Sequence, residues 1–216
     1  MDGVISMEDA RALVGDAKLW PRVRNFLWDF APQVHESWLE PNQLSLRDSP
    51  RVKRYILDSL GVEPCFHAFP KEDGSRILLL DGATLESAAK WLGALACAES
   101  LRRVTSGEVV RELKAKLRGI YPEVFGYTAY FGEFASRRDA EAQSLQTVVV
   151  EEGYSLLQSV VANLPSPLVA RLKFKLPKGL CASAPLRLEE RPSQTNLSAV
   201  LKLFKLKFPE AYKLCC

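Results

Sequence analysis

Apolar residues recur three or four positions apart along most of the chain, and helix-starting and helix-ending residues bound the segments in which they recur. Ser49 and Pro50 open one such segment, and Gly61 ends it. The apolar positions between them are Val52, Tyr55, Ile56 and Leu60. Serine followed by proline is typical of a helix start and glycine of a helix end, so the pattern predicts a helix between Pro50 and Gly61.

The same combination of spacing and end residues predicts that most of the chain is helical. Ser6 and Asp9 have the spacing of a capping box that opens a short first helix. Thr105 and Glu108 have the same spacing before another apolar stripe. Further helices are expected over residues 21–30, 83–104, 108–117, 139–164 and 197–208. Small residues throughout 83–104 indicate that this helix packs closely against a neighbour.

Two short stretches allow more than one structure. The apolar run Ile77 to Leu80 fits either a short strand or a buried helical turn. Residues 171–176 alternate basic and apolar side chains, which favours a half-buried strand over the alternative of a short helix after Pro167. We therefore expect a mainly α fold: a single irregular helical domain over 26–216 with one or two short strands, preceded by an N-terminal extension, residues 1–25, that carries a short helix.

Composition indicates a folded protein of a reducing compartment. Apolar residues make up 47% of the chain and charged residues 25%, a balance far from that of disordered proteins. The five cysteines are an odd number without C-x-x-C spacing, which fits a reducing cytoplasm. Acidic residues near the N-terminus replace the basic and apolar regions of an export signal, and no apolar stretch approaches the length of a membrane span.

Charge is distributed unevenly along the chain. The net charge is +3, but residues 171–216 contain ten basic and three acidic residues, a local balance of +7 against −4 for the first 170. This asymmetry suggests two surfaces that contact unlike partners, although an ordinary solvated surface would give the same count. The residues we expect to bind protein are Arg171, Lys173, Lys175, Lys178, Lys202 and Lys205.

The C-terminal helix allows two further interpretations. Its lysines and Phe204 and Phe208 could place it on an anionic membrane, with Cys215 and Cys216 as lipidation sites. Docking of its apolar face on the rest of the domain is preferred, because any packed helix shows such a face. A single basic cluster around Phe174 is too little to predict nucleic-acid binding.

Residue patterns that support catalysis or cofactor binding do not occur in the sequence. Leu39 stands where an H-E-x-x-H motif that began at His35 would need its second histidine. Cys65 and His67 are too close in sequence to face each other on a strand, and no acid beside them would orient the histidine. Glycine-rich phosphate loops and a G-x-S-x-G elbow do not occur either. We expect no metal, no cofactor and no enzymatic activity.

The central block ILLLDGATLESAAKWLGALACAESLRRVTSGEVVRELKAKLRGIYPEVFGY resembles the SctK family of type III secretion accessory proteins, also called YscK-like or OrgA/MxiK-like. An apolar run leads through Gly82 into a small-residue helix and then into a glutamate-containing helix before an aromatic segment. Phe30-Ala31-Pro32 with His35-Glu36-Ser37-Trp38-Leu39 resembles the family as well, and so does the stretch from Arg171 to Pro177. The resemblance extends over residues of about 26 to 208.

The resemblance implies a non-enzymatic cytoplasmic adaptor of the bacterial injectisome. Such a protein connects the inner-membrane ring protein, SctD, to the SctQ and SctL components of the sorting platform. It lies at the cytoplasmic face of the inner membrane through the secretion apparatus, touching the membrane only indirectly and binding no nucleic acid.

A function of another class stays open on the sequence. Aromatic residues are frequent in the middle of the chain, and scattered polar residues could complete a ligand pocket among them. The residues of this alternative pocket are Trp91, Tyr121, Tyr127 and Tyr130. The protein would then be a small helical enzyme or a ligand-binding domain, and its aromatic residues would otherwise belong to the core.

Overall fold

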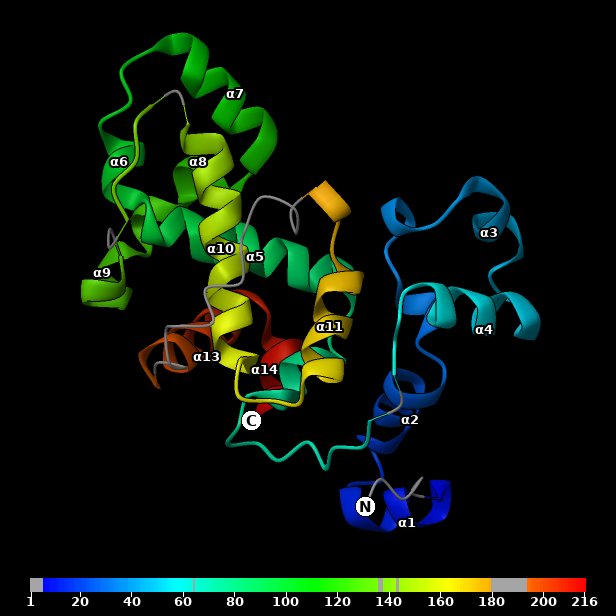
Figure 1. The fold of residues 1–216 in the computed structure, drawn as a ribbon. Coiled ribbons are helices and arrows are strands. Elements are labelled where there is room, and N and C mark those ends of the chain that lie inside the picture. The colour runs from blue at the N-terminus through cyan, green and yellow to red at the C-terminus, as the bar shows by residue number, and fades with distance from the viewer. Residues whose placement is uncertain (1–5, 64, 136–137, 143, 180–193) are drawn as a thin grey trace. The chain divides into compact units, whose positions relative to one another are not determined.

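The computed structural model describes residues 6–63, 65–135, 138–142, 144–179 and 194–216, and within them every regular element is a helix (Figure 1). The α-helices are α1 (Met7–Val14), α2 (Trp20–Trp28), α3 (Pro41–Leu46), α4 (Pro50–Ser59), α5 (Gly82–Ala96), α6 (Ala98–Arg102), α7 (Gly107–Leu117), α8 (Ile120–Glu123), α9 (Thr128–Phe131), α10 (Leu145–Val161), α11 (Ser166–Lys175), α13 (Gln194–Lys207) and α14 (Pro209–Cys215). The 3-10 helices are η1 (Ala31–Gln33), η2 (Glu36–Trp38), η3 (Ser75–Leu79), η4 (Val124–Gly126) and η5 (Gly132–Phe134). The predicted mainly α class is confirmed.

The chain divides into two compact units. The first unit consists of Met1–Gly82, Leu164–Lys178 and Lys213–Cys216, and the second of Ala83–Asn163 and Gly179–Tyr212. Each unit therefore combines segments that are far apart in the sequence.

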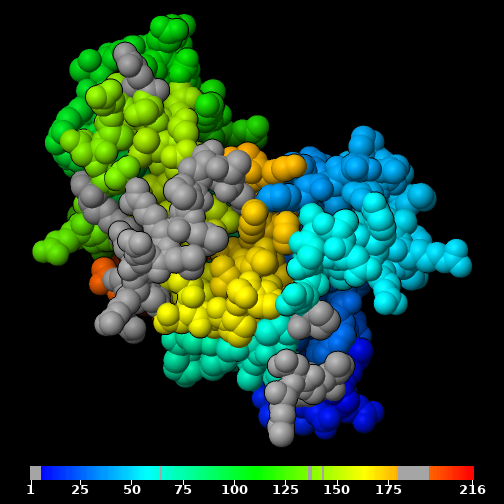
Figure 2. Space-filling view, in the orientation of Figure 1, coloured from blue at the N-terminus to red at the C-terminus, as the bar shows by residue number. Residues whose placement is uncertain are grey.

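Local end signals account for several helix boundaries. The main-chain N–H of Asp9 donates to Ser6 Oγ at 3.1 Å, so Ser6 caps α1 as predicted. Helix α4 begins at Pro50 and turns Ile56 into the core, which confirms the helix expected there. α3 and α4 lie side by side at the surface of the first unit (Figure 2).

The two ambiguous stretches are both helical. The run from Ile77 belongs to the buried 3-10 helix η3, one of the two structures expected for it. The strand expected over 171–176 is wrong, because Arg171–Lys175 is the second half of α11. Buried positions in α11 follow helical spacing, but two of them, Arg171 and Lys175, are cations. Because these two buried residues are basic, the helical spacing of the buried positions looked in the sequence like an alternation of basic and apolar side chains.

The core of the first unit is aromatic around α2. The ring of Phe26 contacts the rings of Phe30 and Phe69 edge-on, with centroids 5.6 Å and 5.7 Å apart. All three side chains are fully buried. This cluster packs against α11, whose buried cations lie over its rings.

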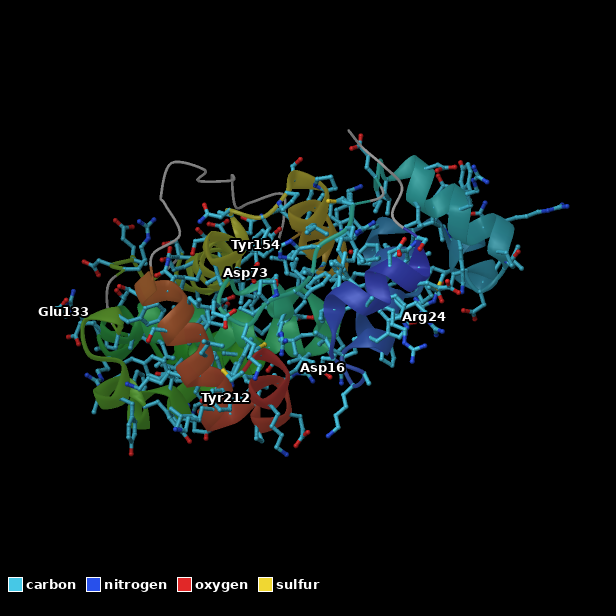
Figure 3. The ribbon with its side chains drawn as sticks, turned by 90° about the horizontal axis from the view of Figure 1, so that it is seen from below. Asp16, Arg24, Asp73, Glu133, Tyr154 and Tyr212 are labelled. Atoms are coloured by element: carbon cyan, nitrogen blue, oxygen red, sulfur yellow. The ribbon has the colours of Figure 1, made fainter. Side chains whose placement is uncertain are left out.

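The core of the second unit depends on a close crossing of α5 and α10 (Figure 1). A Cβ on Gly93 would overlap the carbonyl oxygen of Val149, and a Cβ on Gly153 would overlap that of Ala89. The small residues of α5 thus let two backbones touch, as the sequence indicated. Beside the crossing, Tyr154 is fully buried and its hydroxyl accepts a hydrogen bond from Gln158 at 2.8 Å (Figure 3).

We expect Gly93→Ala to destabilise the protein by about 3 kcal/mol or more, because the added methyl group overlaps main-chain atoms that cannot move without separating the helices. Urea unfolding measures the loss. Gly107→Ala is the control: a Cβ there meets nothing within 4 Å, so its effect should stay within about 0.5 kcal/mol. Equal stabilities of the two variants would contradict the proposed role of the crossing.

Candidate functional site

The basic residues of α11 divide between the interior and the surface. Arg171 is 2% exposed and Lys175 is 1% exposed. Lys173, on the opposite side of the same helix, and Lys178, just beyond it, are exposed. Arg171 and Lys175 therefore do not contribute to an exposed basic surface, which corrects the expectation that all six cations contact a partner.

Lys175 ties α11 to the end of η3. Its Nζ donates hydrogen bonds to the carbonyl oxygens of Leu78 at 2.6 Å and Leu80 at 2.7 Å, and it lies 5.0 Å from the centre of the Phe26 ring. Burial lowers the pKa of Lys175 to about 7, and the charge of Asp81 opposes this shift. A neutral amine still carries two N–H donors, which match the two carbonyl acceptors.

Arg171 holds the connecting segment after α4 against the aromatic core. Its Nη2 donates to the carbonyl oxygen of Glu63 at 3.0 Å, and its guanidinium lies 5.4 Å and 5.7 Å from the ring centres of Phe26 and Phe30. Burial lowers the pKa of Arg171 to about 10, and Cys65 opposes the shift. The side chain stays charged at neutral pH and acts in packing.

The exposed cations at the end of α11 surround Trp38, and we call Trp38, Lys173 and Lys178 the Trp38 patch. The two ammonium groups lie 5.2 Å and 5.6 Å from the centre of the indole ring. Trp38 Nε1 donates to the carbonyl oxygen of Leu176 at 2.8 Å, which fixes the ring against the end of α11. The stretches 35–39 and 171–177, both singled out in the sequence, meet at this patch.

Two exposed cations of the second unit lie on α13, and we call Lys202 and Lys205 the α13 pair. Both are exposed. The apolar face of α13 is turned inward, with Val200 and Phe204 fully buried, and Asn196 joins it to α10 through a hydrogen bond to Ser159 at 2.8 Å. The predicted preference for docking over membrane insertion agrees with this burial.

The aromatic residues of the alternative ligand pocket gather only in part. Trp91 and Tyr127 contact each other edge-on, 5.6 Å apart, whereas Tyr121 pairs with Phe125. Lys207 fills the space beside the first pair: its Nζ lies 4.5 Å from the Trp91 ring centre and 4.2 Å from that of Tyr127. The same ammonium pairs with Glu123. The sequence did not reveal that Lys207 packs inside the unit, because Glu123, Trp91 and Tyr127 lie far from it along the chain.

The Cys65 and His67 side chains do not form a nucleophilic pair. His67 Nε2 lies 2.7 Å from Asp73 Oδ2, so the expectation that no acid would orient this histidine is wrong. Burial raises the pKa of the Cys65 thiol, against a smaller opposite effect of Arg171. A nucleophilic thiol needs the opposite shift. Within the part of the chain that the structure describes, no cluster of three metal-ligating side chains occurs and no helix has the length and hydropathy needed to cross a membrane.

Comparison with known proteins identifies one family. Residues 23–120 match the family model described as YOP proteins translocation protein K (YscK). No curated protein and no solved structure matches the chain. The matched segment runs from α2 to the first residue of α8 and includes Trp38, whereas the two lysines of the Trp38 patch and the α13 pair lie beyond its C-terminal end.

Titration of Lys175 should make the protein more stable as the pH rises from about 7 to about 8.5. The pKa of this group is about 7 in the folded chain and 10.5 when unperturbed. The unfolded state therefore binds more protons in this window, so the burial penalty present at low pH is relieved as pH rises. The expected gain in the free energy of unfolding is roughly 1.5 kcal/mol, measured by urea unfolding.

Two variants assign that gain. Lys175→Met removes the titrating group and should abolish the rise, while leaving two buried carbonyls without a donor and lowering stability by about 2 kcal/mol. Lys173→Met, on the exposed side of the same helix, should keep the rise. An undiminished rise in Lys175→Met would show that another group titrates.

Proposed function

We propose that the chain, which is a YscK-like protein of type III secretion, acts as a non-enzymatic adaptor within that apparatus. In this role it connects the inner-membrane ring protein, SctD, to the SctQ and SctL proteins of the sorting platform. It would lie at the cytoplasmic face of the inner membrane and be held there by these protein contacts.

The observation that carries the proposal is that each compact unit presents its own exposed pair of lysines next to aromatic rings. In the first unit the pair borders Trp38. In the second unit Lys202 lies 5.7 Å from the centre of the Phe131 ring, with Lys205 one turn further along α13. Aromatic side chains are enriched at protein interfaces, and charges at the rim steer a complementary partner, so two such places suit a protein that binds two partners.

Charge on these surfaces would select partners more than it would add affinity. Exposed ammonium groups attract acidic surfaces and speed association, and their effect weakens with salt. Contacts of this kind let an adaptor discriminate between partners without binding them irreversibly.

The buried groups support a role in binding over one in catalysis. Arg171 and Lys175 are the two basic residues with the most lowered pKa values. Lys175 Nζ and Arg171 Nη2 donate to main-chain carbonyls, and both charges lie over aromatic rings. Those contacts stabilise the first unit and leave neither group facing an open site.

Charge reversal in one unit should weaken one interaction and spare the other. We expect Lys173→Glu with Lys178→Glu to reduce binding of one partner by roughly tenfold or more, and Lys202→Glu with Lys205→Glu to do the same for the other. The measurement is co-purification and titration with the SctD-like cytoplasmic domain and with the SctQ-like protein, at low and high salt.

A matched control changes the same charge elsewhere. Lys114 and Lys116 are exposed on α7, and reversing both to glutamate should leave both interactions unchanged. If each lysine pair can be reversed with no effect on either partner, the two surfaces are solvated faces and the adaptor proposal loses its basis.

A further inference from the structure

A hollow of about 350 Å³ lies beside the α13 pair in the second unit. Its lining residues are Phe131, Phe134, Thr195, Ser198, Ala199 and Lys202. The two phenylalanines come from the end of α9 and from η5, and the other four come from α13. The hollow is thus formed by elements of one unit.

The sequence of α13 explains why the hollow is open. Thr195, Ser198 and Lys202 recur at helical spacing and form an exposed stripe. The first two are small, and below them the rings of Phe131 and Phe134, which are 8% and 5% exposed, form the floor of the hollow with their centroids 6.0 Å apart. An apolar side chain of another protein fits such a floor.

The rim of the hollow is positive. α13 contains no acidic residue from Gln194 to Lys207, and among the residues that the structure describes no acid lines the hollow. Lys202 forms no ion pair with any residue that the structure describes; its ammonium has the Phe131 ring as its neighbour. Glu133, between the two phenylalanines in sequence, is exposed and projects from the edge of the structure (Figure 3).

A membrane is a poor occupant for this surface. Helices that lie on a bilayer insert a broad apolar face, but the apolar face of α13 is already inside the core, with Leu203 1% exposed. Of the large apolar residues of α13, Leu206 is the one that remains exposed, at 39%. A concave floor with a cationic rim instead fits a side chain that enters it and carboxylates that stay at its edge.

We infer that the hollow binds an acidic amphipathic segment of a partner protein. One aliphatic or aromatic side chain of that segment enters between the phenylalanine edges and Ser198, and its carboxylates pair with Lys202 and Lys205. The inference rests on the proposed function and gives the chemistry of the partner that the α13 pair would bind. The apolar anchor supplies most of the affinity, and the lysines select an acidic sequence.

Selection of binding peptides tests the inference directly. The probe is a phage-displayed library of random peptides of about twelve residues, selected on the full-length protein. Enriched peptides should carry net negative charge and at least one large apolar residue. Replacing that residue with alanine should weaken binding roughly tenfold, as measured by fluorescence anisotropy.

Two variants locate the binding. Ser198→Trp fills the hollow from an exposed helix position, and Lys202→Glu with Lys205→Glu reverses the charge of the α13 pair. Each change should weaken binding of the selected peptides roughly tenfold or more. Ala115→Trp places the same large side chain at an exposed position of α7 and should have no effect. Unchanged binding to Ser198→Trp, or enrichment of neutral or basic peptides, overturns the inference, as does a selection that yields nothing.

Two further outcomes separate the inference from the proposed function. If the partner proteins co-purify equally with wild type and Ser198→Trp, the adaptor proposal stands and the hollow is not its docking site. If binding of the selected peptides depends on the hollow but neither partner protein co-purifies, the inference about the hollow is supported and the adaptor proposal fails. Binding to vesicles with about 30% phosphatidylglycerol that Lys202→Glu with Lys205→Glu abolishes would assign the α13 pair to a membrane and overturn the inference.

Discussion

Lys175 donates hydrogen bonds from a fully enclosed position to the carbonyl oxygens of Leu78 and Leu80, nearly a hundred residues earlier in the chain. A buried amine is tolerated only where its donors are satisfied, so α11 has one position on the first unit in which this side chain is stable. Arg171, one turn away, adds a contact to Glu63. Together the two cations tie α2, η3 and the segment after α4 to a single helix.

Enclosing these two cations determines which others face solvent. Because Arg171 and Lys175 occupy the inner side of α11, Lys173 is turned outward, and Lys178 follows beyond the helix end. Trp38 then lies between these two ammonium groups, with its N–H bound to Leu176. The composition of the exposed patch is thus a consequence of the packing beneath it.

The helices that sequence patterns predict well are those whose core positions are apolar. Helix α4 can be predicted without reference to any other part of the chain. Ser49 and Pro50 mark its start, and Ile56 and its apolar neighbours have helical spacing. The sequence pattern does not predict α11, because the buried Lys175 looks like a surface residue in the sequence. Its hydrogen-bond partners are main-chain carbonyls of Leu78 and Leu80, which no local pattern reveals. Similarly, the small residues of α5 predict close packing, but the identity of α10 as the partner follows only from Gly153 meeting Ala89 in space.

The candidate site shows the same limit, since position along a helix does not determine what a lysine contacts. Lys202, Lys205 and Lys207 all lie on α13. Lys207 reaches Glu123 and two aromatic rings and is held within the unit. Lys202 lies over a single ring at the rim of a hollow whose described lining residues include no acid. A basic side chain is available to a partner only where the fold leaves it exposed, so the local charge of +7 overstates the part of this chain that can recognise another protein.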